Sequence, residues 1–356
     1  MRNLILAICF CSITVAAQSG RSRAPQPKPT PPKSRVNINV TEPISANKTP
    51  IPTPTPPVNT KETAVDNDEN GVIRVDSVLV PIPVSVLDAS GKAIVNLNLK
   101  DFALRVNGEN QEIAEISRSE SPVRLALLFD NSSSVTSARN FEKNAATKFF
   151  KRVLRSIDQA SLYSVSTISR QEQKLTGDTR QLIKAINNLS EPQGATALFD
   201  GVFMASRYLR EVNGRRVIVI VSDGVDTLSD STLEETVKEA QLANCQIYVV
   251  KTTDFENFQI TGQRGTNANL RDLSAERRMQ ELATQTGGTV YSPLDEKELD
   301  AAFIQIAAEL SQQYILSYYP TETKRGNGDF KQIELRVVNK PNLSVRTRKG
   351  YYVPKI

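Results

Sequence analysis

The sequence predicts an α/β protein in which a doubly wound, mostly parallel sheet is nested in a small antiparallel β domain formed by the N- and C-terminal flanks. Two patterns support this fold class. From about residue 121 to residue 312, unbroken apolar runs typical of buried strands alternate with segments whose apolar residues recur at helical spacing. On both sides of this region, short runs alternate apolar and polar residues, as half-buried antiparallel strands do. Neither flank supplies a convincing sheet alone, so we expect the two flanks to pair.

Residues 1–17 have the pattern of a secretory signal peptide. Arg2 provides the positive start, residues 4–15 are apolar, and Val15-Ala16-Ala17 is a small-residue cleavage site. The apolar stretch is shorter than the ~20 residues that a membrane-spanning helix needs. We therefore expect an exported protein that is periplasmic, bound to the cell envelope or secreted, with no transmembrane segment after signal cleavage. Retention of the segment as an anchor is the alternative.

Residues 18–70 are predicted to be a disordered, proline-rich linker. Eleven of the 19 prolines fall between Pro25 and Pro57, and this composition favours extended polyproline II over a packed core. A spacer across an envelope and a tether with no fixed role both fit the composition. Residues 18–48 also carry an excess of five positive charges, which equals the net charge of +5 for the whole chain. The folded part is therefore near neutral, and no nucleic-acid partner is expected.

The composition excludes several kinds of site. The chain contains no histidine, which excludes catalytic triads with histidine and metal sites ligated by histidine. Of its three cysteines, Cys9 and Cys11 lie in the leader, so Cys245 is left without a disulfide partner in the mature chain. Cys245 opens an apolar run and is expected to be a buried small hydrophobe. Neither a phosphate-binding Gly-x-x-x-x-Gly-Lys-Ser/Thr loop nor a Gly-x-Ser-x-Gly motif occurs.

Both flanks are expected to contain short strands. Residues 71–120 form the first part of the antiparallel domain, with strands predicted at 72–86, 102–106 and 113–116 and a turn at Asp88-Ala89-Ser90-Gly91. Residues 313–356 form its second part, with strands predicted at 314–319, 333–338 and 343–345 and a glycine-containing turn at 324–329.

The central region, residues 121–312, is expected to hold the parallel sheet. The predicted strands are 123–129, 162–168, 217–221, 245–250 and 289–291. Helices are predicted around 141–153, 182–186 and 198–209, then in a segment capped by Ser229 or Asp230, in a segment ending at Gly287-Gly288, and at 295–312. The polar segment 254–271 is expected to be a long loop that follows a strand, on the face where partners bind in such folds.

Three polar fragments follow predicted strands and together contain the ligand types of one metal site. They supply Asp130, Ser132 and Ser134, then Thr196, then Asp223. Because the carboxyl ends of parallel strands share one edge of the sheet, we expect these side chains to converge. Two carboxylates and three hydroxyls suit a hard divalent cation, with Mg²⁺ preferred and Mn²⁺ or Ca²⁺ as alternatives. An Asp-x-Ser-x-Ser motif alone is a weak signal, because Asp and Ser before a helix are more often helix caps or turn formers than ligands. Asp200 and Asp226 are interpreted as helix-start or loop carboxylates.

Residues 121–312 resemble a von Willebrand factor A (VWA) domain, whose fold is Rossmann-like, and the three fragments resemble its metal-ion-dependent adhesion site (MIDAS). The matching residues are Asp130, Ser132 and Ser134 in the first loop, Thr196 in the second and Asp223 in the third. The resemblance implies that the hydroxyls coordinate the cation, that the aspartates hold it largely through waters, and that a partner's carboxylate completes the octahedron. Ser133 stands where the family commonly has glycine.

The flanks extend the resemblance to a bacterial group of exported proteins with a "VWFA-related" domain. The similar segments are 82–88, 99–102, 313–320 and 346–352. This resemblance implies the architecture and says little about biology. The function we favour is that of a binding module and not an enzyme: an exported adhesion or scaffold protein whose Mg²⁺ captures an acidic group of a protein partner. Two alternatives stay open, namely a metal-assisted hydrolase with carboxylates or lysine as its only bases, and a structural envelope domain that the metal merely stabilises.

Overall fold

The computed structural model describes residues 79–118, 121–133, 139–263, 269–320, 328–338 and 340–353. The predicted signal peptide (1–17) and linker (18–70) lie outside these ranges, and so do Ser134, the start of the first predicted strand and most of the predicted turn at 324–329. The chain divides into two units, Met1–Asn70 and Gly71–Ile356. All of the structure reported below belongs to the second unit.

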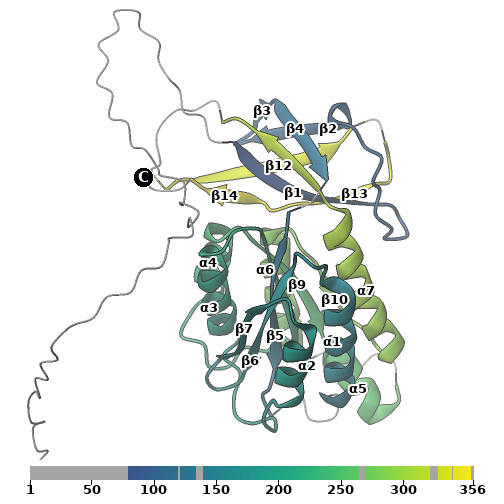
Figure 1. Ribbon diagram of the computed structural model, residues 1–356, viewed down its shortest axis with the longest axis vertical. Coiled ribbons are helices and arrows are strands. Elements are labelled where there is room, and N and C mark those ends of the chain that lie inside the picture. Colours follow the sequence, from purple (N-terminus) through teal and green to yellow (C-terminus); the bar gives the residue numbers. More distant parts are fainter. Residues whose placement is uncertain are drawn as a thin grey trace, which may run out of the picture. The chain divides into compact units, whose positions relative to one another are not determined.

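A six-stranded sheet forms the centre of this unit (Figure 1). Its order is β10-β9-β8-β5-β6-β7, with β5 Val123–Asp130, β6 Gln159–Val165, β7 Arg170–Thr176, β8 Arg215–Ser222, β9 Cys245–Lys251 and β10 Val290–Tyr291. The strands run parallel except for β7, which pairs antiparallel with β6 at one edge. The apolar runs of β5 and β8 are buried along nearly their whole length, as strands covered on both faces must be.

Helices cover both faces of the central sheet. Their bounds are α1 Arg139–Val153, α2 Thr179–Asn187, α3 Leu198–Arg210, α4 Leu233–Leu242, α5 Thr253–Thr261, α6 Leu270–Thr286 and α7 Glu296–Gln312. Alternate residues of β5 enter different cores. Leu125 and Leu127 pack with α1, α2 and α7, whereas Ala126 and Leu128 pack with α3, α4 and α6. The predicted doubly wound α/β class is confirmed. Within the described ranges, no helix has the length and apolarity that crossing a membrane requires.

The flanks form two four-stranded antiparallel sheets, β13-β1-β11-β4 and β14-β12-β2-β3. Their strands are β1 Val80–Leu87, β2 Phe102–Val106, β3 Glu109–Gln111 and β4 Ile113–Arg118, then β11 Tyr314–Tyr318, β12 Phe330–Val337, β13 Ser344–Arg346 and β14 Gly350–Tyr352. Each sheet mixes the two flanks, because β11 pairs with β1 and β4, and β12 pairs with β2. Ile82, Leu104 and Leu316 belong to one shared core. The expectation that the flanks pair with each other is confirmed.

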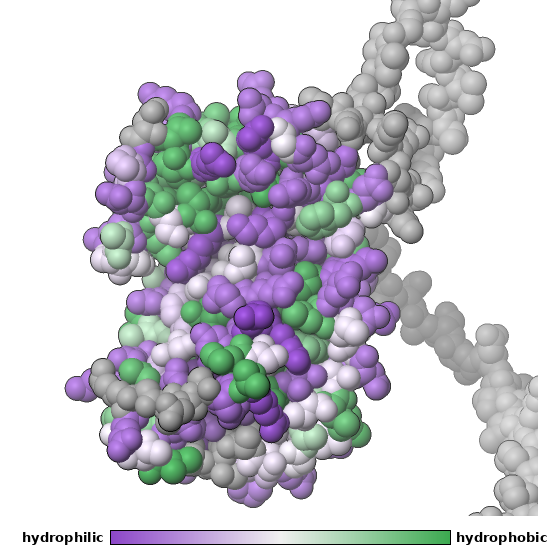
Figure 2. All heavy atoms as spheres, turned by 180° about the vertical axis from the view of Figure 1, so that it is seen from behind, coloured by the Kyte–Doolittle hydropathy of each residue, from purple (hydrophilic) through white to green (hydrophobic). Residues whose placement is uncertain are grey.

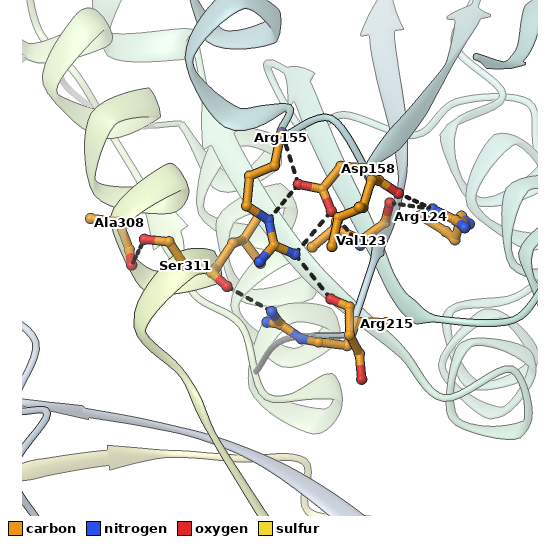
Figure 3. A network of polar contacts seen from close by, with 10 residues as sticks. Val123, Arg124, Arg155, Asp158, Arg215, Ala308 and Ser311 are labelled. Carbon is orange, nitrogen blue, oxygen red and sulfur yellow. Dashed lines mark hydrogen bonds and ion pairs between the residues drawn. The ribbon is translucent and has the colours of Figure 1, made fainter. Parts of the chain in front are cut away.

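A network of charged groups lies at the edge of the central sheet where β5 and β8 begin (Figure 3). The buried carboxylate of Asp158 accepts hydrogen bonds from the backbone N–H of Val123 at 2.7 Å and from the guanidinium of Arg155 at 2.8 Å. Arg215, the first residue of β8, donates to the carbonyl oxygen of Leu310 in α7 at 2.6 Å. These bonds attach the segment between α1 and β6, and the end of α7, to the amino-terminal edge of the sheet. The opposite edge, at the carboxyl ends of the strands, is where ligands bind in this fold class.

The segment 254–271 was predicted to be one long loop, and this prediction is wrong. It contains most of α5 and the first residues of α6. Its composition is mostly polar, and within α5 only Phe255 and Glu256 are buried, so no apolar stripe of helical spacing stands out in the sequence. Gly262, at a φ of 68°, ends α5 in the left-handed conformation that glycine adopts without strain.

The predicted cap of α4 is also wrong. The helix begins at Leu233, and Thr232 rather than Ser229 or Asp230 is its cap, because the side chains of Thr232 and Glu235 form a reciprocal capping box. Strands β3, β7 and β14 were not predicted. Two of them have only three residues, and β7 is a polar edge strand with no fully buried residue.

Candidate metal centre

Two predicted ligands lie at the carboxyl ends of neighbouring strands. Asp130 is the last residue of β5, and Asp223 directly follows β8, which pairs in parallel with β5. The carboxylate of Asp130 accepts a hydrogen bond from the hydroxyl of Ser222 and, through Oδ1, one from the backbone N–H of Ser132 at 2.9 Å. Asp130 and Ser132 are each 1% exposed. The first ligand loop therefore folds back over the end of its own strand.

Hydrogen bonds join the three predicted ligand loops in pairs. The backbone N–H and the hydroxyl of Ser133 donate to the carbonyl oxygen of Gly194 at 3.2 and 3.0 Å, which joins the first loop to the second. The N–H of Thr196 donates to the hydroxyl of Thr227 at 2.9 Å, and the N–H of Thr227 returns to the carbonyl of Thr196 at 2.9 Å, which joins the second to the third. The bond from Ser222 to Asp130 joins the third to the first. Ser133, the departure from the family pattern, thus strengthens the contact between two loops.

The structure places the loops of four of the five predicted ligands together: Asp130, Ser132, Thr196 and Asp223. Ser134 lies outside the described residues. Thr196 is 4% exposed, and Asp223 is partly exposed, so the site reaches the surface on the side of the third loop. Metal ligation by these residues stays a prediction.

The interpretation of Asp200 and Asp226 agrees with their contacts. Asp226 Oδ1 accepts the backbone N–H groups of Leu198 and Phe199 at 2.8 and 3.2 Å, at the start of α3. Asp200 accepts the N–H groups of Asp230 and Ser231 at 3.0 and 2.9 Å. Both carboxylates are therefore occupied in holding the second and third loops in place.

The carboxylate of Asp130 has an unfavourable environment when no cation balances it. Burial raises the pKa of Asp130 from 3.8 to about 6, the nearby charge of Asp223 adds to the increase, and hydrogen bonds from Ser222 and Ser132 oppose it. A divalent cation beside the two carboxylates would replace this repulsion with attraction. Mg²⁺ fits such a site, since it takes few direct protein oxygens and keeps several waters. The residues present therefore suit the cation that the sequence predicts.

Two further buried carboxylates lie close to the site, and the sequence analysis missed both. Glu142 of α1 is 1% exposed and Glu256 of α5 is 8% exposed. Burial raises the pKa of Glu142 well above 4.5, and the charges of Glu256 and Asp130 add to this increase. Burial also raises the pKa of Glu256, to about 8, although the hydroxyl of Thr252 donates to it at 2.7 Å.

The sequence contained a signal for Glu142, because this residue lies on the same helical face as the apolar Ala145 and Phe149. Glu256 was hidden by the wrong loop prediction. Among the residues that the structure describes, no three Asp, Glu, His or Cys side chains form a group that could bind a metal. A cation at the predicted site therefore depends on hydroxyl ligands as well as carboxylates.

Gly224 holds the third loop against α6. Its φ is 81°, and a Cβ at this position would lie 2.8 Å from the Cγ of Met279, so only glycine fits without displacement. The N–H of Gly224 donates to the hydroxyl of Ser222 at 3.0 Å. Asp223 Oδ1 in turn accepts the N–H of Val225 at 2.8 Å. Helix α6 therefore lies directly beside the loop that carries Asp223.

The profile of the von Willebrand factor type A domain matches residues 125–303, which is just over half of the chain. The chain belongs to this family. The matched range contains all five predicted ligands of the VWA metal site, and its strands and helices are those of the central sheet. None of the curated proteins matches the chain.

Several solved structures are similar to this VWA protein at low sequence identity. The PilB minor pilin from Streptococcus sanguinis is 13% identical with a TM-score of 0.42, over 55% of this chain and 63% of that one. The conserved hypothetical protein BatB from Bacteroides thetaiotaomicron is 14% identical with a TM-score of 0.40, over 52% and 98%. The vWF domain of the type V pili tip protein Mfa5 from Porphyromonas gingivalis is 14% identical with a TM-score of 0.41, over 52% and 94%. This chain thus spans less than two thirds of the pilin, and the function has to be argued from the site.

Proposed function

We propose that this chain is an exported protein-binding module of the adhesion or scaffold type, and that it acts through a divalent cation. The cation, Mg²⁺ in preference to Mn²⁺ or Ca²⁺, would be held by Asp130, Ser132, Ser134, Thr196 and Asp223. Its remaining coordination position would accept a carboxylate from a partner protein. Membership of the VWA family supplies the framework for this proposal.

The observation that carries the proposal is the position of Asp130 and Asp223. Burial, and after it the charge of Asp223, raise the pKa of Asp130. Among the described residues no salt bridge joins either carboxylate to a lysine or arginine. Arg139 lies near enough to interact with Asp130 electrostatically, but it forms no ion pair with it. Two neighbouring carboxylates beside hydroxyls, with no direct cationic partner, are the electrostatic pattern that a bound divalent cation relieves. No observation favours an enzyme over a binding module.

Direct metal titration is the first test of this proposal. Isothermal titration of the mature chain with Mg²⁺ and with Mn²⁺ is expected to show one site, which Asp130→Ala and Thr196→Ala remove while the circular dichroism spectrum is retained. Asp300→Ala, which changes a partly exposed carboxylate in α7, serves as the control and is expected to bind the cation normally.

Partner binding is the second test. Immobilised protein is incubated with an envelope extract in Mg²⁺ and in chelator, and the two ligand-site variants are run in parallel. Retention of the same partner in chelator, or by Thr196→Ala, contradicts the proposal.

Two other outcomes would favour the alternative functions. If the cation raises thermal stability but no partner binds in a cation-dependent way, the protein is a structural envelope domain that the metal stabilises. Hydrolysis of a phosphoester or peptide panel that Asp130→Ala abolishes would favour the metal-assisted hydrolase. Export is tested by N-terminal sequencing of the secreted or periplasmic protein, which is expected to begin at Gln18.

A further inference from the structure

A small pocket lies beside the predicted cation site, between α6 and the loop that follows β8. Its volume is about 110 Å³, and it is lined by Val225, Asp226, Arg271, Ser274, Ala275 and Arg278. Because α6 packs against Gly224, the pocket directly adjoins the loop that carries Asp223. The two arginines are seven residues apart on one helical face, which places them about 10 Å apart along the helix axis. They therefore stand at the two ends of the pocket.

The positive charges of the pocket are not balanced by ion pairs. Arg271 and Arg278 are exposed, and neither forms a salt bridge with any residue in the described ranges. Among the described residues that line the pocket, Asp226 is the only acidic one. Its Oδ1 accepts the two N–H groups at the start of α3 and the hydroxyl of Ser229, so the positive end of the α3 dipole already balances its charge.

Exposed aliphatic side chains lie at the same end of α6. Leu270 and Leu273, on the first turns of α6, are 87% and 50% exposed. Figure 2 shows one face of the molecule, on which hydrophobic side chains gather in several patches among hydrophilic ones. Large aliphatic side chains next to unpaired arginines are typical of a protein-binding surface.

We propose that Arg271 and Arg278 bind a second acidic side chain of the partner, so that the partner is a segment with two carboxylates and neighbouring aliphatic residues. One carboxylate would reach the cation, and the other would enter the arginine pocket. This inference rests on the proposed function. A guanidinium donates two parallel hydrogen bonds to a carboxylate. The pocket has room for a carboxylate side chain with a few waters, since one water occupies about 30 Å³.

The test uses the mature chain and fluorescein-labelled peptides of serine, leucine and acidic residues. One peptide carries a single aspartate, and a matched set carries an additional glutamate at varied spacing from it. Fluorescence anisotropy in excess Mg²⁺ is expected to show that the best diacidic peptide binds about three- to tenfold more tightly than the monoacidic one, the gain that one or two partly exposed ion pairs supply. The double variant Arg271→Ala/Arg278→Ala is expected to remove this gain without changing the affinity for the monoacidic peptide.

Arg277→Ala is the matched control, because Arg277 is an exposed arginine of α6 that does not line the pocket. It is expected to keep the gain. Equal affinities of the double variant and the native chain for the diacidic peptide overturn the inference while leaving the proposed function intact. Diacidic binding that depends on the arginines but persists in chelator supports the pocket and contradicts the cation-based function. If no peptide binds in Mg²⁺, both proposals fail.

Discussion

Replacement of Asp130 by asparagine is expected to stabilise the metal-free chain at neutral pH. The folded chain binds the proton of Asp130 more tightly than the unfolded chain does, because the pKa rises from 3.8 to about 6 on folding. The free energy of unfolding therefore decreases as the pH rises from about 3.8 to about 6, and stays at the lower value above that range. Asparagine carries no charge, so the variant avoids this loss.

The magnitude follows from the size of the pKa change. A rise of about two in the pKa of Asp130 lowers the free energy of unfolding at pH 7.5 by ~3 kcal/mol. The introduced amide would keep the hydrogen bond from the N–H of Ser132, but the hydroxyl of Ser222 would lose its acceptor, at a cost of ~1 kcal/mol. The net gain of ~2 kcal/mol corresponds to an increase in Tm of ~4–8 °C. At pH 4.5, where most of the native Asp130 is protonated, we expect the two proteins to unfold at nearly the same temperature.

Thermal unfolding in EDTA at pH 7.5 and pH 4.5 measures this effect, and saturating Mg²⁺ is expected to stabilise the native chain but not the variant. Asp158→Asn is the control at the opposite edge of the sheet. Asp158 is equally buried, but its hydrogen bonds with Arg155 and the N–H of Val123 outweigh the effect of burial and hold its pKa below 3.8. Its replacement is therefore expected to lower Tm at pH 7.5. A lower Tm for Asp130→Asn in EDTA at pH 7.5 would refute the reasoning from buried charge.

Three further predictions concern stability. Gly224→Ala is expected to lower the free energy of unfolding in urea by ~2–4 kcal/mol, because it combines the strain of a positive φ with a close contact to Met279. The control is Gly91→Ala, at a φ of 80° with open space around it, which should lose only the contribution of the strain. Equal losses in the two variants would contradict the role of Met279. Glu256→Gln is expected to raise Tm in EDTA at pH 9, because the native chain loses stability as the pH rises from 4.5 to about 8. The difference in Tm between variant and native chain should vanish near pH 4. An equal gain in Tm at both pH values would argue against titration of Glu256. Phe149→Ala, which removes a ring 4.9 Å from that of Phe303, is expected to cost ~3–5 kcal/mol; a loss below ~1 kcal/mol would mean that α1 and α7 are not packed as described.

The predictable parts of the fold are those in which a single physical requirement, such as burial on both faces or a helix cap, restricts which residues can occur. Strands β5 and β8 are buried on both faces and therefore had to be unbroken apolar runs. The end of α6 and the start of α7 were visible because Gly287 and Asp295 act as caps through purely local geometry. Strand β7 was missed because it is a polar edge strand without a buried residue, so its sequence shows no apolar pattern typical of a strand.

Some residues of the candidate site could likewise be predicted from the sequence, and others could not. Asp130 and Asp223 could be placed together because the carboxyl ends of adjacent parallel strands meet. The burial of Glu142 could be inferred from the apolar face of α1. Its proximity to Glu256 and Asp130 arises from the packing of α1 and α5 near the site, and the local sequence does not indicate which helices will be neighbours. The arginine pocket depends on α6 lying against Gly224, which is likewise a tertiary contact.

The way in which the central domain is inserted has a mechanical consequence. The chain enters it after β4 and leaves it through β11, and these two strands are paired antiparallel, with Arg118 opposite Tyr314. Strand β11 is also paired with β1 on its other side. A pulling force applied to the two flanks would therefore act on the hydrogen bonds that pair strands of one flank with strands of the other. The loops that carry Asp130, Thr196 and Asp223 lie at the far edge of the central sheet, outside the path of that force, so a ligand could stay bound there while the protein is under tension.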